Sequence, residues 1–80
     1  MKVTVNVTRR PEIADPQGAT VHRALADLGY GSVRSVRVDR TLHLDVDGEE
    51  PEAVRAAVTR MCEQLIANPV LEDFEVVVQP

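Results

Sequence analysis

Residues 2–8 read Lys-Val-Thr-Val-Asn-Val-Thr, and their strict alternation of apolar and polar side chains decides the fold of the chain. Successive side chains of an extended strand point to opposite faces, so Val3, Val5 and Val7 share one face. This pattern predicts a half-buried β-strand. It is expected to end at Arg9-Arg10-Pro11, because proline cannot donate to a sheet.

A helix is predicted to begin after this strand, at Asp15-Pro16. Aspartate is a favoured N-cap residue, and proline at the first helical position loses no hydrogen bond. Val21, Leu25 and Leu28 recur at helical spacing and give the helix one apolar stripe. Gly29 suits the left-handed position that ends many helices.

Two alternating segments, residues 32–38 and 41–47, predict a β-hairpin. The connection between them is Asp39-Arg40, which is shorter than most loops and differs from the favoured Asn-Gly turn. The residues expected to face inward are Val36, Val38, Leu42, Leu44 and Val46.

A second helix is predicted to open at Pro51, and Asn68-Pro69 is expected to end it, because proline cannot continue a helix. A last strand is predicted over residues 73–78. The inward stripe of the helix is expected to contain Val54, Val58, Met61 and Leu65.

The predicted order of elements is therefore β-α-β-β-α-β, within one domain of residues 1–80. Right-handed crossovers place both helices of such a chain on the same side of the sheet. The expected fold is α+β and ferredoxin-like, a four-stranded antiparallel sheet with two helices on one face. The other face of the sheet stays open, and it is polar but mixed.

Composition excludes several classes of function. The net charge of −4 argues against nucleic acid as a partner, and no apolar run is long enough to span a membrane. The start of the chain lacks the apolar segment of a secretory signal. A single cysteine, Cys62, cannot form an internal disulfide and fits a reducing cytoplasm. Residues 1–40 carry a balance of +3 and residues 41–80 one of −7, an asymmetry that can guide association.

No catalytic constellation is recognisable among the residues. Cys62 is expected to be a buried structural thiol, and His22 and His43 lack the spacing of metal ligands. The first helical turn, Asp15-Pro16-Gln17-Gly18, presents free N–H groups that suit an anion. The same residues also suit a plain capped helix start, in which Gly18 allows close packing.

Four segments of the sequence carry a family resemblance: Asp15-Pro16-Gln17-Gly18, Leu28-Gly29-Tyr30, Val36-Arg37-Val38 and residues 61–74. The last reads Met-Cys-Glu-Gln-Leu-Ile-Ala-Asn-Pro-Val-Leu-Glu-Asp-Phe and is the most specific. With these motifs the chain resembles the PurS family, the small subunit of bacterial and archaeal phosphoribosylformylglycinamidine synthase. One departure is Asp39-Arg40, where many relatives carry Gly-Lys.

The resemblance implies an accessory subunit of an ATP-dependent ligase in purine biosynthesis, without catalytic residues, cofactor or metal of its own. The assembled enzyme converts formylglycinamide ribonucleotide, glutamine and ATP, with Mg, to formylglycinamidine ribonucleotide. The implied partners are the PurL synthetase subunit, the PurQ glutaminase subunit and a second copy of this chain, as a dimer that can pair further into a tetramer. The subunit is expected to bridge PurL and PurQ and to support ammonia transfer. Candidates for partner contact are Asp15, Gln17, Gly18, Arg37, Arg40, His43 and Asn68.

An alternative interpretation shares the predicted topology. Regulatory modules of the ACT type bind small effectors near their first loop and helix start, and residues 9–18 occupy that place in this chain. An ACT-like small-molecule-binding module therefore stands beside the accessory-subunit interpretation.

Overall fold

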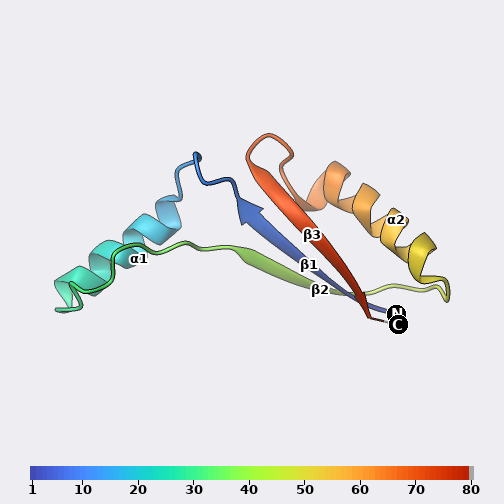
Figure 1. The fold of residues 1–80 in the computed structure, drawn as a ribbon, viewed down its shortest axis with the longest axis horizontal. Coiled ribbons are helices and arrows are strands. Elements are labelled where there is room, and N and C mark those ends of the chain that lie inside the picture. Colours follow the sequence, from blue (N-terminus) through green and yellow to red (C-terminus); the bar gives the residue numbers. More distant parts are fainter. Residues whose placement is uncertain (80) are drawn as a thin grey trace.

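The computed structural model describes residues 1–79 and contains three strands, two α-helices and a short π-helical turn (Figure 1). The strands are β1 (Lys2–Arg9), β2 (Arg40–Asp45) and β3 (Glu72–Gln79). The helices are α1 (Pro16–Asp27) and α2 (Pro51–Met61), and the turn η1 (Cys62–Ile66) follows α2 directly. The predicted first strand, last strand and both helix starts are thus present.

The core is built on the alternating residues of β1. Val3, Val5 and Val7 are fully buried, and Val58 of α2 and Cys62 of η1 pack against them. β1 lies in the middle of the sheet and pairs antiparallel with β2 on one side and β3 on the other. Val54 and Ala67 complete the buried cluster. The period of two in β1 is therefore the main source of the hydrophobic core.

The predicted four-stranded, ferredoxin-like sheet is wrong. The sheet has three strands in the order β2-β1-β3. Residues 32–38 form no strand with it, and the chain runs straight through Asp39-Arg40 into β2 instead of turning back (Figure 1). The physical reason is that the two-residue turns favoured in hairpins need positive φ angles, which glycine adopts most readily, and Asp39-Arg40 contains no glycine. Neither residue has a positive φ in the structure.

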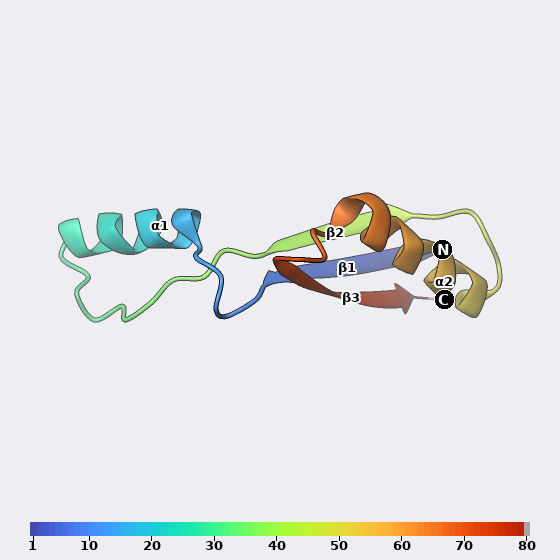
Figure 2. The same cartoon turned by 90° about the horizontal axis from the view of Figure 1, so that it is seen from above.

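The two helices do not share one face of the sheet either. α2 lies beside the sheet, whereas α1 extends away from it (Figure 1, Figure 2). The molecule is therefore elongated, with extents of 50 × 24 × 14 Å. We call residues 15–38, which comprise α1 and the extended segment that returns beside it, the arm.

The ends of α1 follow the predicted capping. Asp15 accepts a hydrogen bond from the N–H of Gly18 at 3.0 Å. At the other end, Gly29 has a φ of +100°, the N–H of Tyr30 donates to the carbonyl of Leu25, and the N–H of Gly29 donates to that of Ala26. These two bonds form a Schellman motif, so the sequence signals for the two ends of this helix are confirmed. Its apolar stripe is not buried in this chain, because Val21 and Leu28 are exposed.

The predicted inward stripe of the second helix is wrong beyond Val58. Met61 and Leu65 are exposed, and the Leu65 side chain reaches 86% exposure. The chain changes from α-helix to π-helix after Met61, which adds residues to the turn and rotates Leu65 away from the core. Cys62 fills the core position instead and is fully buried.

Candidate functional site

A polar pocket of about 280 Å³ lies where the arm joins the sheet. The inner face of β1 changes there from the three buried valines to Arg9, and the register places Arg9 opposite Glu72 of β3. On the other side of β1, Arg40 of β2 is paired with Val7. The pocket is lined by Val7, Arg9, Asp15, Pro16, Gln17, Val38, Asp39, Arg40 and Glu72.

Arg40 ties this pocket to the connection between η1 and β3. Its Nη2 atom donates to the carbonyl of Ile66 and to Glu72 Oε1, both at 3.0 Å. The same Glu72 oxygen accepts the backbone N–H of Asn68 at 2.9 Å. The side chain of Glu72 is only 12% exposed, so this ion pair is better shielded from water than an ordinary surface pair.

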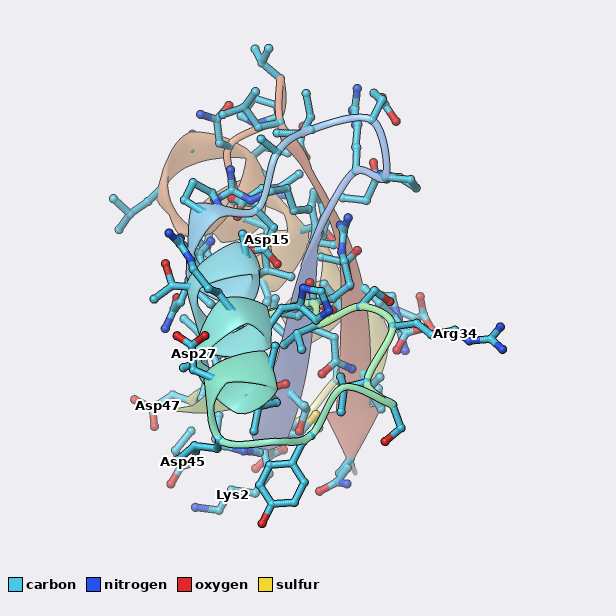
Figure 3. The ribbon with its side chains drawn as sticks, turned by 90° about the vertical axis from the view of Figure 1, so that its left-hand side faces the viewer. Lys2, Asp15, Asp27, Arg34, Asp45 and Asp47 are labelled. Atoms are coloured by element: carbon cyan, nitrogen blue, oxygen red, sulfur yellow. The ribbon has the colours of Figure 1, made fainter. Side chains whose placement is uncertain are left out.

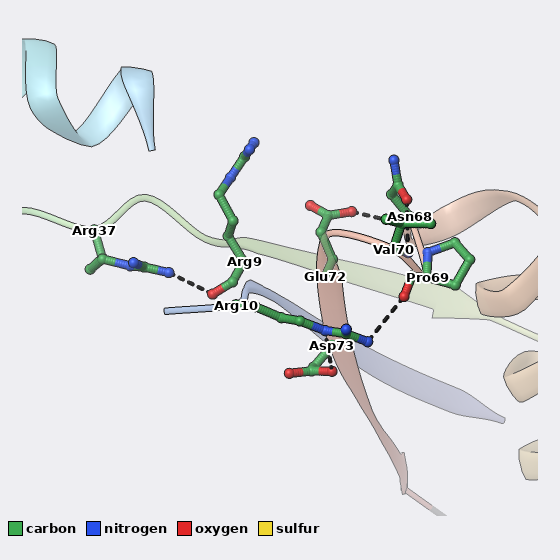
Figure 4. A network of polar contacts seen from close by, with 8 residues as sticks. All are labelled: Arg9, Arg10, Arg37, Asn68, Pro69, Val70, Glu72 and Asp73. Atoms are coloured by element: carbon green, nitrogen blue, oxygen red, sulfur yellow. Dashed lines mark hydrogen bonds and ion pairs between the residues drawn. The ribbon is translucent and has the colours of Figure 1, made fainter. Parts of the chain in front are cut away.

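A second arginine holds the other side of that connection (Figure 4). Arg10 Nε donates to Asp73 Oδ1 at 3.2 Å, and its Nη2 donates to the carbonyl of Pro69 at 3.0 Å. Val70 donates its N–H to Asn68 Oδ1 at 3.0 Å. Side chains from β2 and from the residue that follows β1 therefore fix residues 66–73, which we call the platform loop, in one shape.

The platform loop presents apolar side chains to solvent. Leu65 stands just before it, and Val70 on the loop is 72% exposed. Exposed apolar side chains on a rigid loop are suited to docking, because little conformational freedom is lost when a partner binds. The platform loop, with Leu65 beside it, is therefore suited to contact with a partner.

The carboxylate of Asp15, at the base of the arm, accepts backbone hydrogen bonds and lies near positive charges. Hydrogen bonds from the backbone N–H groups of Val38 and then Gly18 hold the pKa of Asp15 below its ordinary value of 3.8. The positive charges of Arg37 and Arg9 act in the same direction. Arg37 in turn donates from Nη2 to the backbone carbonyl of Arg9, which links the arm to the end of β1 (Figure 4).

Charged side chains away from the pocket sit at the surface. At the end of the sheet remote from the arm, Lys2 Nζ pairs with Asp45 Oδ2 at 2.9 Å. This contact with Lys2 holds the pKa of the Asp45 carboxyl below its usual value. Arg34, in the extended part of the arm, points away from the ribbon (Figure 3).

The structure offers little reactive chemistry within residues 1–79. Burial raises the pKa of the Cys62 thiol, which keeps it protonated and unreactive. No group of three or more His, Cys, Asp or Glu side chains in the described part of the chain is arranged to hold a metal ion. No helix among these residues is long and apolar enough to cross a bilayer.

The structure brings some of the predicted contact residues together and separates others. Asp15, Gln17 and Arg40 line the same pocket. Asn68 joins them through Glu72. Gly18 is buried, so its role is structural, and His43 is exposed on β2. Its neighbours in the strand, Leu42 and Leu44, face the core, so His43 belongs to the opposite face of the sheet.

Sequence reasoning missed the residues that build the platform loop. Arg9 ends the first strand and Arg10 follows it, and Glu72 and Asp73 begin the last strand. The antiparallel pairing of β1 with β3 places Arg9 opposite Glu72, and it brings Arg10 within ion-pair distance of Asp73. Opposite charges at the end of one predicted strand and the start of its neighbour were the signal that could have revealed them.

Comparison with known proteins gives consistent matches along the whole chain. The sequence model of the family described as "PurS: Phosphoribosylformylglycinamidine (FGAM) synthase" matches residues 2–80. The phosphoribosylformylglycinamidine synthase subunit PurS of Methanocaldococcus jannaschii is 36% identical over 78 residues, which cover 98% of this chain and 94% of the relative. The PurS subunit of Bacillus subtilis is also 36% identical, over 73 residues, 91% of this chain and 86% of the relative.

Solved structures agree with the sequence matches. B. subtilis PurS superposes with a TM-score of 0.87 at 34% identity, covering 99% of this chain and 98% of that one. A chain in the structure of PurLQS from Thermotoga maritima gives a TM-score of 0.83 at 34% identity, covering 95% of this chain and 93% of that one. The three-stranded sheet with an extended arm therefore resembles folds that have been determined experimentally.

Proposed function

Since this chain belongs to the PurS family and is a subunit of phosphoribosylformylglycinamidine (FGAM) synthase in purine biosynthesis, we propose that it is the non-catalytic subunit that bridges PurL and PurQ. The T. maritima relative is found in a PurLQS assembly. The corresponding complex of this chain would convert formylglycinamide ribonucleotide, glutamine and ATP to formylglycinamidine ribonucleotide. The ATP and Mg belong to its larger subunits, and the site of action is the cytoplasm.

The observation that carries this proposal is the platform loop. Arg10 and Arg40 hold its backbone through the carbonyls of Pro69 and Ile66. The loop is thereby fixed in shape before any partner arrives, while Leu65 and Val70 stay uncovered. Preorganised apolar contacts of this kind supply binding energy at a low entropic cost.

A bridging subunit needs two separated surfaces, and the contact candidates divide in that way. Gln17, Arg37, Arg40 and Asn68 are exposed around the base of the arm and the platform loop. His43 is exposed on the opposite face of the sheet. We assign one larger subunit to the first surface and the other to the second. Asp15 and Gly18 act indirectly, by shaping the helix start that displays Gln17.

Two further functions belong to the same proposal. Holding the glutaminase and the synthetase at a fixed spacing supports the transfer of ammonia between their sites. Association of this chain with a second copy is also expected, as a dimer that can pair into a tetramer. The ACT-like interpretation is not retained, because its main argument was a topology that the chain does not adopt.

Reconstitution tests the bridging role. Purified PurL and PurQ are combined with glutamine, ATP, Mg and the ribonucleotide, with and without this chain, and the amidated product is measured. We expect little product unless the chain is added. A Leu65→Ala/Val70→Ala variant is expected to need a much higher concentration for the same rate, whereas an Arg60→Ala variant, altered at an exposed position of α2, should match the wild type. Full activity without the chain would refute the proposal.

A further inference from the structure

The polar pocket at the base of the arm is lined by two arginines that the fold uses differently, Arg9 and Arg40. Arg40 is engaged, because its Nη2 atom donates to the carbonyl of Ile66 and to Glu72. The side chain of Arg9 makes no hydrogen bond and no ion pair in the part of the chain that the structure describes. Figure 4 shows this side chain extending away from β1, while the backbone carbonyl of the same residue accepts from Arg37.

Two carboxylates that line the same pocket are already occupied. Asp15 accepts backbone N–H groups with both of its oxygens. Glu72 stands opposite Arg9 in the register of β1 and β3, but its Oε1 atom accepts from Arg40 and from the N–H of Asn68. Arg9 is half-buried, and its guanidinium is always charged. It would therefore be stabilised by an acceptor that residues 1–79 do not supply.

The geometry of the donors favours a carboxylate as that acceptor. A guanidinium presents its N–H groups in a planar fork that matches the two oxygens of a carboxylate. Gln17 lines the pocket from the first turn of α1, where a backbone N–H has no partner within the helix. A phosphate with two negative charges fits less well, because the carboxylates of Asp39 and Glu72 also line the pocket and would repel it.

The position of the pocket indicates where the carboxylate comes from. Glu72 connects the pocket to the platform loop, because it lines the pocket and also accepts the backbone N–H of Asn68 (Figure 4). A subunit that covers the exposed side chains of Leu65 and Val70 therefore docks beside this pocket. In such interfaces the apolar anchors supply much of the affinity, whereas a charged pair sets orientation and partner choice.

We propose that the pocket receives an aspartate or glutamate side chain of the larger subunit that docks on the platform loop, with Arg9 as its ion-pair partner. The inference rests on the proposed function and deepens it, because it specifies the chemical group that this subunit presents. Arg9 then determines specificity. A surface that placed an apolar or basic group over the pocket would leave the guanidinium desolvated and unpaired, and it would bind weakly.

Binding measurements test the role of Arg9. The chain is titrated separately with PurL and with PurQ, and each dissociation constant is measured by sedimentation velocity. Arg9→Gln removes the charge at a similar side-chain length, and it should weaken the binding of one larger subunit by about tenfold while leaving the other unchanged. Arg9→Lys keeps the charge without the planar fork and should give an intermediate constant. Arg60→Gln, at an exposed position of α2, is the matched control and should bind as the wild type does.

Carbodiimide footprinting tests the chemistry of the group in the pocket. The reagent activates exposed carboxylates for amidation, and mass spectrometry then locates the modified residues. At least one Asp or Glu of the bound subunit should be protected by the wild-type chain and should be modified in a saturated complex with Arg9→Gln. A complex without such a carboxylate would overturn the inference.

Inorganic phosphate distinguishes a free anion from a carboxylate of the partner. It is titrated into the chain alone while the Nε–H resonance of Arg9 is followed by NMR, and we expect no saturable shift. Saturable binding of phosphate would show that the pocket takes a free anion and would overturn the inference.

The binding data also separate this inference from the proposed function. A wild-type chain that binds neither PurL nor PurQ would overturn the bridging function and this inference together. A wild-type chain that binds both, with Arg9→Gln binding both equally well, would overturn this inference alone.

Discussion

The Oδ2 atom of Asp15 accepts a hydrogen bond from the backbone N–H of Val38 at 2.8 Å, while its Oδ1 atom accepts one from the N–H of Gly18 at 3.0 Å. One carboxylate thus caps α1 and fastens the returning segment of the arm to the start of the helix. α2 begins without such a cap, because Glu50 makes no side-chain cap bond. The geometry of the arm therefore depends on Asp15.

Asp15→Ala is expected to loosen the arm without unfolding the sheet. Both hydrogen bonds disappear, so the N–H of Val38 should exchange with deuterium much faster, and the helix should lose protection at its first turn. Asp27→Ala, at the exposed C-terminal end of the same helix, is the control and should exchange like the wild type. Unchanged protection of Val38 in the Asp15→Ala variant would show that the two hydrogen bonds of Asp15 do not hold the arm in place.

The hydrogen bonds accepted by the Asp15 carboxylate are also expected to weaken in acid. The pKa of Asp15 in the folded chain lies below 3.8, chiefly because of the N–H of Val38, so the unfolded chain binds the proton more readily. Its stabilising effect is therefore present above about pH 4 and is lost as the pH falls through the folded pKa. Hydrogen exchange of residues 36–38, measured from about pH 6 to about pH 3 and corrected for intrinsic rates, should show this loss. Asp15→Asn cannot titrate, and the arm of that variant should show a weaker pH dependence.

The sequence predicted the parts of this molecule that local chemistry determines. Alternation in β1, the Asp15-Pro16 helix start and the Gly29 helix end are all confirmed. Alternation around Asp39-Arg40 indicated extended chain correctly, but it carries no information about which strand each segment pairs with. The prediction of a hairpin therefore rested on an assumption that residues 32–38 and 41–47 pair with each other.

The error at Leu65 has a different cause. The stripe assumed a constant helical period, and a π-turn breaks that period over residues 62–66. After this turn, the side chains of Arg40 and Arg10 donate hydrogen bonds to the carbonyls of Ile66 and Pro69. These bonds depend on contacts between segments that are distant in sequence. A resemblance across residues 61–74 located this region but did not give its geometry.

Gly18 should tolerate no larger side chain. A Cβ at this position would lie 2.4 Å from the backbone oxygen of Val36, closer than real contacts allow. We expect Gly18→Ala to force the returning segment away from α1 and to destabilise the arm by about 1–3 kcal/mol. Gly31→Ala is the matched control, since a Cβ there meets nothing within 4 Å. Denaturant melts followed by circular dichroism, with hydrogen exchange of the arm, would separate the two variants. Equal effects would refute the close packing.

Val58 and Leu65 should respond in opposite ways to truncation. Val58 is fully buried, so Val58→Ala is expected to lower the free energy of unfolding by about 2 kcal/mol. Leu65 is exposed on the π-turn, so Leu65→Ala should change stability by less than about 0.5 kcal/mol. Urea unfolding measures both. A large loss of stability in Leu65→Ala would mean that the side chain is buried after all.

The ion pair between Arg40 and Glu72 should couple energetically, because Glu72 is largely shielded from water. Arg40→Ala leaves that carboxylate without its cation and frees the carbonyl of Ile66, and we expect a loss of about 1 kcal/mol in the free energy of unfolding. In a double-mutant cycle, Arg40→Ala/Glu72→Ala should be less destabilised than the two single changes added together, by about 0.5–1 kcal/mol.

Arg40→Lys separates charge from geometry in the same pair. It keeps the positive charge, but a single ammonium cannot reproduce the planar guanidinium that reaches Ile66 and Glu72 together. We therefore expect Arg40→Lys to raise the concentration of this chain needed to activate PurL and PurQ, whereas Arg60→Lys on α2 should have no effect. If Arg40→Lys activates the complex as the wild type does, the shape of the platform loop does not depend on this arginine, and the docking surface must be held by Arg10 alone.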